Sequence, residues 1–194
     1  MKRTGYIAAI VAVSVASAAF AHNGATGIVK DRMVAMSAMG DALKATAPMM
    51  SGETNYDAGV VRDTAAVIKS HAGAAMTDLF PADNANKASF VKDAIWDDWE
   101  TFAALAKQLE TYAEGLALAA DNGFADQLDG MGDAGTMMGA DTMMGAGAMM
   151  GGDAALTPAT LTVEDLAAMP VDTVFAKLGD TCASCHTQFR SKAE

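Results

Sequence analysis

Two cysteines and a histidine near the C-terminal end form the clearest chemical motif in the sequence, Cys182-Ala183-Ser184-Cys185-His186. A Cys-x-x-Cys-His run is the attachment motif of c-type haem. On a helical turn, two thiols three residues apart can reach the two vinyl groups on one edge of a porphyrin, and the next imidazole then lies under the iron. The motif therefore predicts one covalently bound haem c, with thioether bonds at Cys182 and Cys185 and with His186 as an axial iron ligand.

Other uses of the cysteine pair fit the sequence less well. These are the only two cysteines of the chain, so a structural zinc site would lack the four ligands that it needs. A disulfide between them would close a very small loop and would stabilise the fold little. A thioredoxin-like redox motif needs a βαβ environment, and no segment alternates with period two for long enough to indicate a sheet.

Four stretches with apolar residues at steps of three and four predict the amphipathic helices that position this motif. Each apolar stripe needs a partner to bury it, so we expect an all-α, antiparallel four-helix bundle with the haem on its C-terminal helix. The stripes are Val29, Met33, Met36, Gly40 and Leu43; Val61, Ala65, Ile68, Ala72, Ala75 and Leu79; Ile95, Trp99, Phe102, Ala106, Leu109, Ala113 and Leu116; and Val171, Val174, Leu178, Cys182, Cys185 and Phe189.

Turn-forming residues mark the ends of these helices. We expect Pro48 with Ser51-Gly52 to end the first helix and Asn55-Tyr56-Asp57 to cap the second. Phe80-Pro81 is expected to end the second helix, and Asp121-Asn122-Gly123 the third.

The composition changes abruptly between about residues 130 and 158. Gly, Ala, Asp and Met dominate there, and the unit Thr-Met-Met-Gly-Ala occurs twice, at residues 136–140 and 142–146. This glycine content argues against a stable helix. The segment is therefore predicted to be a flexible insertion before the last helix.

The N-terminal residues have the pattern of a signal peptide. Lys2 and Arg3 precede the apolar run from Ile7 to Ala19, and Ala19-Phe20-Ala21 places small residues at the cleavage positions. The run is short for a membrane span, and a retained N-terminal anchor is the alternative. We expect residues 1–21 to be removed and residues 22–194 to form the mature protein, located in the periplasm without stable membrane insertion.

The chain is strongly acidic, with 13 Lys and Arg against 24 Asp and Glu. Cleavage of the signal peptide would remove Lys2 and Arg3 and change the formal charge from −11 to −13. Such a surface repels nucleic acid and anionic membranes and attracts basic proteins. We therefore expect redox protein partners with basic docking surfaces and no nucleic-acid partner, although the charge also serves to keep an exported protein in solution.

These features together resemble the class II c-type cytochromes, the cytochrome c′ family, in which the attachment motif lies close to the C-terminus. Arg32, the Gly-x-x-x-Tyr-Asp turn from Gly52 to Asp57, Ile95-Trp96, and Phe189-Arg190 after the motif follow one another as in that family. The resemblance covers the mature chain apart from the insertion. It implies a mono-haem protein that is not an enzyme and that is a monomer or a homodimer.

The resemblance also implies two functional branches, which differ at one position of the first helix. In the high-spin branch an apolar residue there leaves the iron open to nitric oxide or carbon monoxide, and in the low-spin branch a methionine is the sixth ligand. The position falls four residues after Arg32 and twenty before Tyr56, at Met36. Because His/Met ligation suits electron transfer, the sequence predicts a low-spin electron carrier, with high-spin gas binding as the alternative.

Several residues around this ligand set leave alternatives open. Met33 and Met39 lie one turn either way from Met36 and are core residues or rival ligands. By the resemblance, Arg32 lies near a haem propionate, and Arg190 is placed to do likewise. The other interpretation of both arginines is a solvated charge on a helix surface.

The remaining aromatic residues and histidines have less specific interpretations. Phe189 and Trp99 would pack near the porphyrin, or simply in an aromatic core. His71 is expected at the surface or in an interface. His22 would be the mature N-terminal residue, whose amine and imidazole chelate copper, and thioethers suit Cu(I). Copper binding through the Met-rich insertion is therefore a second alternative, beside the simpler interpretation of a low-complexity loop.

Overall fold

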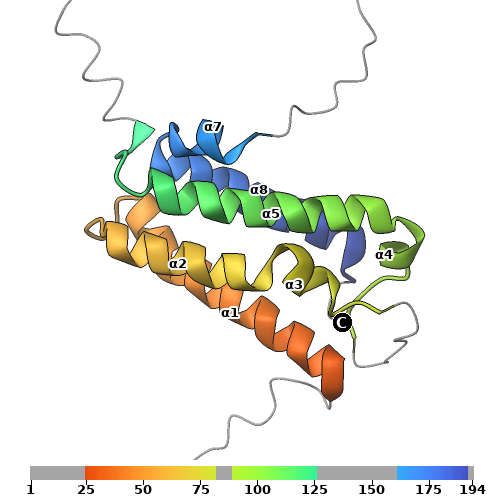
Figure 1. Cartoon of the computed structure of the whole chain (residues 1–194). Coiled ribbons are helices and arrows are strands. Elements are labelled where there is room, and N and C mark those ends of the chain that lie inside the picture. The colour runs from red at the N-terminus through yellow and green to blue at the C-terminus, as the bar shows by residue number, and fades with distance from the viewer. Residues whose placement is uncertain (1–24, 82–88, 126–160, 192–194) are drawn as a thin grey trace, which may run out of the picture.

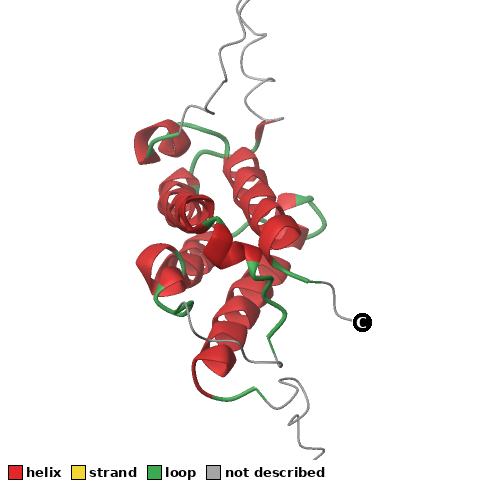
Figure 2. Ribbon diagram, turned by 90° about the vertical axis from the view of Figure 1, so that its right-hand side faces the viewer, coloured by secondary structure: helices red, strands yellow, loops and turns green. Residues whose placement is uncertain are grey.

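The computed structural model describes residues 25–81, 89–125 and 161–191, which fold into a bundle of helices (Figure 1). Four long helices, α1, α2, α5 and α8, run alternately up and down the bundle, and the described residues contain no strand (Figure 2). The predicted all-α four-helix bundle is thereby confirmed. The helices are α1 (Gly27–Met50), α2 (Ala58–His71), α3 (Gly73–Thr77), α4 (Ala94–Asp97), α5 (Trp99–Ala119), α7 (Val163–Ala167) and α8 (Val171–Phe189).

Helix α5 lies at the centre of the packing. It contacts α2 and α3 on one side and α7 and α8 on the other, whereas α1 packs mainly against α2. Within the described residues, α1 and α8 make no comparably close backbone contact. Their facing side chains instead line a cavity, which is described below.

Helix α1 buries a different face from the one that its apolar pattern predicts. Of the predicted stripe only Val29 is fully buried, while Met33, Met36, Gly40 and Leu43 are partly buried. The reason is that these four residues line cavities beside α8. The residues that are buried on α1 are Val29, Arg32, Ala35, Met39 and Thr46.

The second predicted helix is broken at Gly73. This residue has a φ of +57°, in the left-handed region that favours glycine, so α2 ends before it and α3 starts anew. The break shifts the buried stripe by one residue, so that Met76 and Phe80 are buried and the predicted Ala75 and Leu79 are not. The helical residues stop at Thr77, slightly before the predicted end at Phe80-Pro81.

The third predicted helix is also divided, at Asp98. The backbone of Asp98 (φ −127°, ψ 56°) leaves the helical region, and its carboxylate caps α5 by accepting a hydrogen bond from the Thr101 amide at 3.4 Å. Ile95 is buried in α4, but Trp99, predicted as part of the same stripe, is 40% exposed. From Phe102 to Leu116 the predicted stripe is buried.

The other helix ends agree with the turn residues. Helix α1 ends at Met50, with Pro48 inside its last turn. Asp57 caps α2, because its carboxylate accepts hydrogen bonds from the amides of Gly59 at 2.7 Å and Val60 at 3.3 Å.

The start of α8 is fastened to the end of α5. The Asn122 side-chain amide donates hydrogen bonds to the carbonyls of Ala167 and Met169, both at 2.7 Å. The Val171 amide donates to the carbonyl of Gly123 at 3.0 Å. These bonds fix the position from which α8 carries the Cys-x-x-Cys-His motif along the bundle.

Two predictions lie outside the described residues. These are the signal peptide, residues 1–21, and the Met-rich insertion, residues 130–158. Among the helices that the structure describes, none has the length and apolar character that crossing a membrane requires.

Candidate haem-binding site

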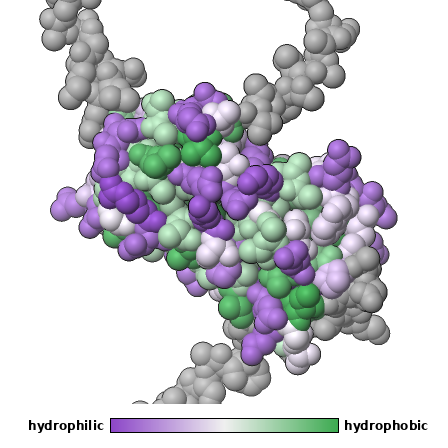
Figure 3. Space-filling view, in the orientation of Figure 1, coloured by the Kyte–Doolittle hydropathy of each residue, from purple (hydrophilic) through white to green (hydrophobic). Residues whose placement is uncertain are grey.

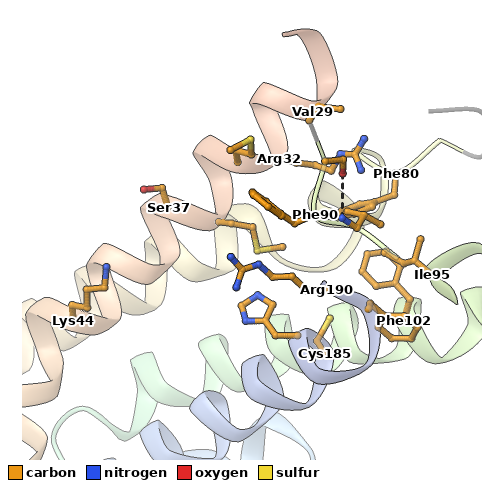
Figure 4. Close-up of a pocket in the computed structure, with 16 residues that line it drawn as sticks. Val29, Arg32, Ser37, Lys44, Phe80, Phe90, Ile95, Phe102, Cys185 and Arg190 are labelled. Atoms are coloured by element: carbon orange, nitrogen blue, oxygen red, sulfur yellow. Dashed lines mark hydrogen bonds between the residues drawn. The ribbon is translucent and has the colours of Figure 1, made fainter. Parts of the chain in front are cut away.

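A cavity of about 600 Å³ lies between α1, α8 and the chain before α4 (Figure 4). Its walls are mainly apolar, and α8 contributes Cys185 and His186 to them. Apolar walls with a few placed polar groups are typical of cofactor sites. Four phenylalanines line the cavity: Phe80, Phe90, Phe102 and Phe189.

The two cysteines of the motif lie one turn apart on α8. Both are free thiols and both are half-buried, so the structure gives no support to a disulfide. Cys185 lines the main cavity, and both thiols line a smaller adjoining cavity of about 80 Å³. Burial raises the pKa of Cys182, and burial together with the neighbouring Cys182 raises the pKa of Cys185 to about 11.

His186 lines both cavities. Desolvation by burial, and then the positive charge of Arg190, lower the pKa of this histidine. A lowered pKa favours the neutral imidazole, which is the form that binds a metal. The C-terminal turn of α8 is thereby suited to hold iron.

The charged groups around the main cavity are all cations. Among the described lining residues Arg32, Lys44 and Arg190 are basic and none is acidic, although the chain as a whole is strongly acidic. The guanidinium of Arg190 lies 5.9 Å from the ring centroid of Phe90. Such a lining favours an anionic ligand.

Arg32 provides the sharpest test of which ligand fits. The residue is only 4% exposed, and none of its three guanidinium nitrogens has a hydrogen-bond partner in the described residues. Its guanidinium lies 4.6 Å from the ring centroid of Phe80, and burial lowers its pKa. A buried cation without an anionic partner is costly. The carboxylates of a haem would supply that partner, so these residues fit the cofactor that the motif predicts.

Three methionines of α1 lie near this site, and their surroundings differ. Met36 lines both the main and the smaller cavity, in each case together with Cys185 and His186. Met33 lines only the main cavity. Met39 lines only the smaller one and belongs to the hydrophobic core, with 6% exposure.

Residues of the chain before α4 complete the site, and the sequence patterns did not indicate them. The Lys92 amide donates a hydrogen bond to the Phe189 carbonyl at 2.9 Å, and the Ser191 amide donates to the Phe90 carbonyl at 2.8 Å. The Lys92 ammonium also donates to the last carbonyls of α8, those of Thr187 at 2.9 Å and Gln188 at 3.2 Å. These bonds hold Phe90 against the cavity.

Lys44 is also absent from the predicted site, although the sequence held a signal for it. It follows Met36 by eight residues, two steps of four along one helix face.

The predicted aromatic residues differ in their positions relative to the cavity. Phe189 lines the cavity as expected, whereas Trp99 does not and lines a separate hollow. His71, at the end of α2, is not among the residues that line the cavity.

The copper alternative is not tested by the structure. His22 and the Met-rich insertion lie outside the described residues. Within the ranges that are described, no group of three or more His, Cys, Asp or Glu could hold a metal ion. Copper binding stays a prediction, to be tested by calorimetric titration with Cu(I).

Comparison with known proteins identifies the family of the chain. The Cytochrome C′ family model matches residues 27–140, more than half of the sequence. The chain belongs to the cytochrome c′ family. The cytochrome therefore has one covalently attached haem c, as proteins of this family of electron carriers and gas binders do. The match ends before α8, so the matched residues do not include the attachment motif; the structure shows this motif on α8, beside the cavity.

Solved cytochromes c′ have the same fold. The protein from Thermochromatium tepidum is 20% identical, with a TM-score of 0.54, and the alignment covers 85% of this chain and 95% of that chain. The protein from Rhodobacter Spheriodes is 22% identical, with a TM-score of 0.54 and coverages of 86% and 96%. A nitric oxide complex of a cytochrome c prime variant from Alcaligenes xylosoxidans is 18% identical, with a TM-score of 0.53 and coverages of 85% and 94%. A comparison with curated proteins gave no match.

Replacement of Arg32 by methionine is expected to stabilise the haem-free chain. The change removes a buried, unpaired charge at the cost of its contact with Phe80, so the free energy of unfolding should rise by about 1–2 kcal/mol. In the haem-loaded protein the same change should lower the reduction potential, because a positive charge beside the cofactor is lost. Urea denaturation and a redox titration measure the two effects.

Arg62 provides the control for this experiment. It is an exposed arginine paired with Asp121, and Arg62→Met should change the stability of the haem-free chain by less than about 0.5 kcal/mol. A loss of stability in haem-free Arg32→Met would contradict the interpretation of Arg32 as an unpaired cation.

Proposed function

We propose that this cytochrome c′ is a periplasmic electron carrier with His186 and Met36 as the axial ligands of its haem. The observation that carries the proposal is the position of Met36, the one methionine of α1 that lines both cavities beside His186. An imidazole and a thioether remain bound to iron in both oxidation states, and an axial methionine raises the reduction potential. Both properties suit a carrier that accepts and releases single electrons without transforming a substrate.

The bound haem supplies the one-electron redox chemistry, and residues of the chain set its surroundings. Cys182 and Cys185 would hold the porphyrin by thioether bonds, and Arg32 would offset the charge of a propionate. The phenylalanines of the cavity wall make the surroundings of the haem less polar, and a less polar environment disfavours the more highly charged oxidised iron.

Binding of nitric oxide or carbon monoxide by a high-spin haem is the second candidate function. The comparisons favour it, because solved structures with this fold include nitric oxide complexes of variants of the cytochrome c prime from Alcaligenes xylosoxidans. In this chain, gas binding would require that the Met36 thioether leave the iron or never bind it. The identity of the sixth ligand therefore separates the two candidates.

An optical spectrum of the purified holoprotein, with and without carbon monoxide, tests the proposal. A low-spin spectrum with a far-red sulfur-to-iron band that carbon monoxide leaves unchanged would support electron transfer. A high-spin spectrum that shifts on addition of carbon monoxide would replace the proposal by the gas-binding function.

Export is part of the same proposal and has a separate test. Two arguments support export. The basic and apolar residues at the N-terminus have the pattern of a signal peptide, and haem c is attached outside the cytoplasm. Intact-mass measurement of the periplasmic protein should give a chain that begins at His22 and carries one haem. A chain that retains residues 1–21 would instead indicate a membrane anchor.

A further inference from the structure

A second hollow, outside the haem site, lies where α5 begins. It has a volume of about 400 Å³, and Trp99 at its edge is 40% exposed. Exposed tryptophans beside a hollow are typical anchors of protein interfaces. We call this feature the Trp99 hollow; it is lined by Thr77, Asp78, Phe80, Pro81, Trp96 and Trp99.

The Trp99 hollow and the haem cavity share an aromatic wall. Phe80 lines both of them, and Phe102 lines the haem cavity. The ring of Phe102 lies 5.4 Å from that of Trp99 and 4.8 Å from that of Phe80, between centroids. Electron transfer between proteins weakens steeply with distance, so a partner seated on Trp99 would approach the cofactor through one layer of side chains.

The surroundings of the Trp99 hollow are acidic. Asp78 lines it, and Asp97 and Glu100 flank its tryptophans along the chain; all three side chains are exposed. None of these three carboxylates has an ion-pair partner among the described residues. Four other carboxylates of the bundle, those of Asp41, Asp121, Glu114 and Glu110, do form ion pairs. In Figure 3, the right-hand end of the molecule, where α5 begins, has hydrophilic and pale side chains and no large apolar area. An apolar anchor among carboxylates complements a cationic occupant.

We propose that the Trp99 hollow is the docking site of a redox protein whose cofactor edge is surrounded by lysines or arginines. The inference rests on the proposed electron-carrier function and names the partner class and the surface that it uses. Trp99 would anchor the complex, and the carboxylates would speed association and orient the partner, with an effect that salt screens.

Binding of mitochondrial cytochrome c, a lysine-rich redox protein, to the holoprotein tests the charge contribution. The double variant Asp97→Asn/Glu100→Gln should bind roughly three- to tenfold more weakly than the wild type at low ionic strength, by calorimetry or NMR titration. The control Glu53→Gln/Asp63→Asn removes two exposed carboxylates far along the chain from the hollow and should retain at least half of the wild-type affinity. Equal weakening by both variants would mean that net charge alone attracts the probe, and would overturn the proposal.

The anchor has its own matched pair of variants. Trp99→Ala should weaken binding roughly tenfold or more, whereas Leu118→Ala, at an apolar residue with 60% exposure, should leave it unchanged. Absence of binding by the wild type, or unchanged binding by Trp99→Ala, would overturn the docking site. Because affinity is measured independently of the iron, a high-spin spectrum would refute the electron-carrier function without altering these titrations.

Discussion

Met36→Leu should convert the holoprotein from a low-spin cytochrome into a high-spin one that binds carbon monoxide. Leucine has no sulfur, so the sixth coordination position would open while the apolar packing of α1 is kept. If the thioether occupies the iron 99% of the time in the wild type, its removal should raise the apparent carbon monoxide affinity about a hundredfold. The reduction potential should fall as well, because the axial methionine that raises it is lost. Optical titration with carbon monoxide and redox titration measure both changes.

Two neighbouring methionines are the controls for this substitution. Met33→Leu and Met39→Leu each remove one thioether from α1, and both should keep the low-spin spectrum and the resistance to carbon monoxide. If Met36→Leu leaves the low-spin spectrum unchanged and Met33→Leu or Met39→Leu converts it to a high-spin one, the ligand is that other methionine. No change in any of the three variants would exclude Met33, Met36 and Met39 as the source of the sixth ligand and would contradict the proposed His/Met ligation.

Phe102→Ala should cost about 3–5 kcal/mol in the free energy of unfolding. Phe102 is only 1% exposed and its ring packs against three others, those of Phe80, Trp99 and Phe189. The remaining side chains belong to different elements of the bundle and cannot close the space together, so a void would remain. This cost is a large share of the stability of an ordinary domain.

Denaturation with guanidinium chloride, followed by the helical circular dichroism signal, measures this loss. Leu118→Ala truncates an apolar side chain that is 60% exposed, and it should change the stability by less than about 0.5 kcal/mol. A loss below about 1 kcal/mol for Phe102→Ala would show that the packing of Phe102 against the three neighbouring rings contributes little to the stability of the bundle.

The sequence predicted the helices better than the faces that they bury. Apolar periodicity correctly indicated α8 and most of α5, because most residues of their stripes are buried in the core of the bundle. The breaks at Gly73 and Asp98 escaped the same pattern, since an interruption of one residue leaves steps of three and four nearly intact. The exposure of Trp99 and the burial of Phe80 follow from those two breaks.

The candidate site was predictable where chemistry dictates spacing. Cys182, Cys185 and His186 must lie within one helical turn of each other, and the sequence therefore displays them together. Met36 and Arg32 lie on the opposite wall, where the family resemblance was needed to select them. Phe90 and Lys92 could not have been predicted, because backbone hydrogen bonds to the end of α8 bring them to the site and no side-chain pattern records those bonds.

The hydrogen bonds between the end of α5 and the start of α8 have a consequence for the evolution of the chain length. Ala125 donates its amide to the Asp172 carboxylate at 3.1 Å, next to the bonds that Asn122 makes to Ala167 and Met169. The described residues on either side of the segment between residues 125 and 161 are thus held together by bonds between the end of α5 and the start of α8. The entropic cost of closing such a loop rises only with the logarithm of its length, by about 0.6 kcal/mol for each doubling. For the flexible insertion that the sequence predicts there, the gain or loss of repeats should therefore cost little, and the bonds at its ends would still fix the start of α8.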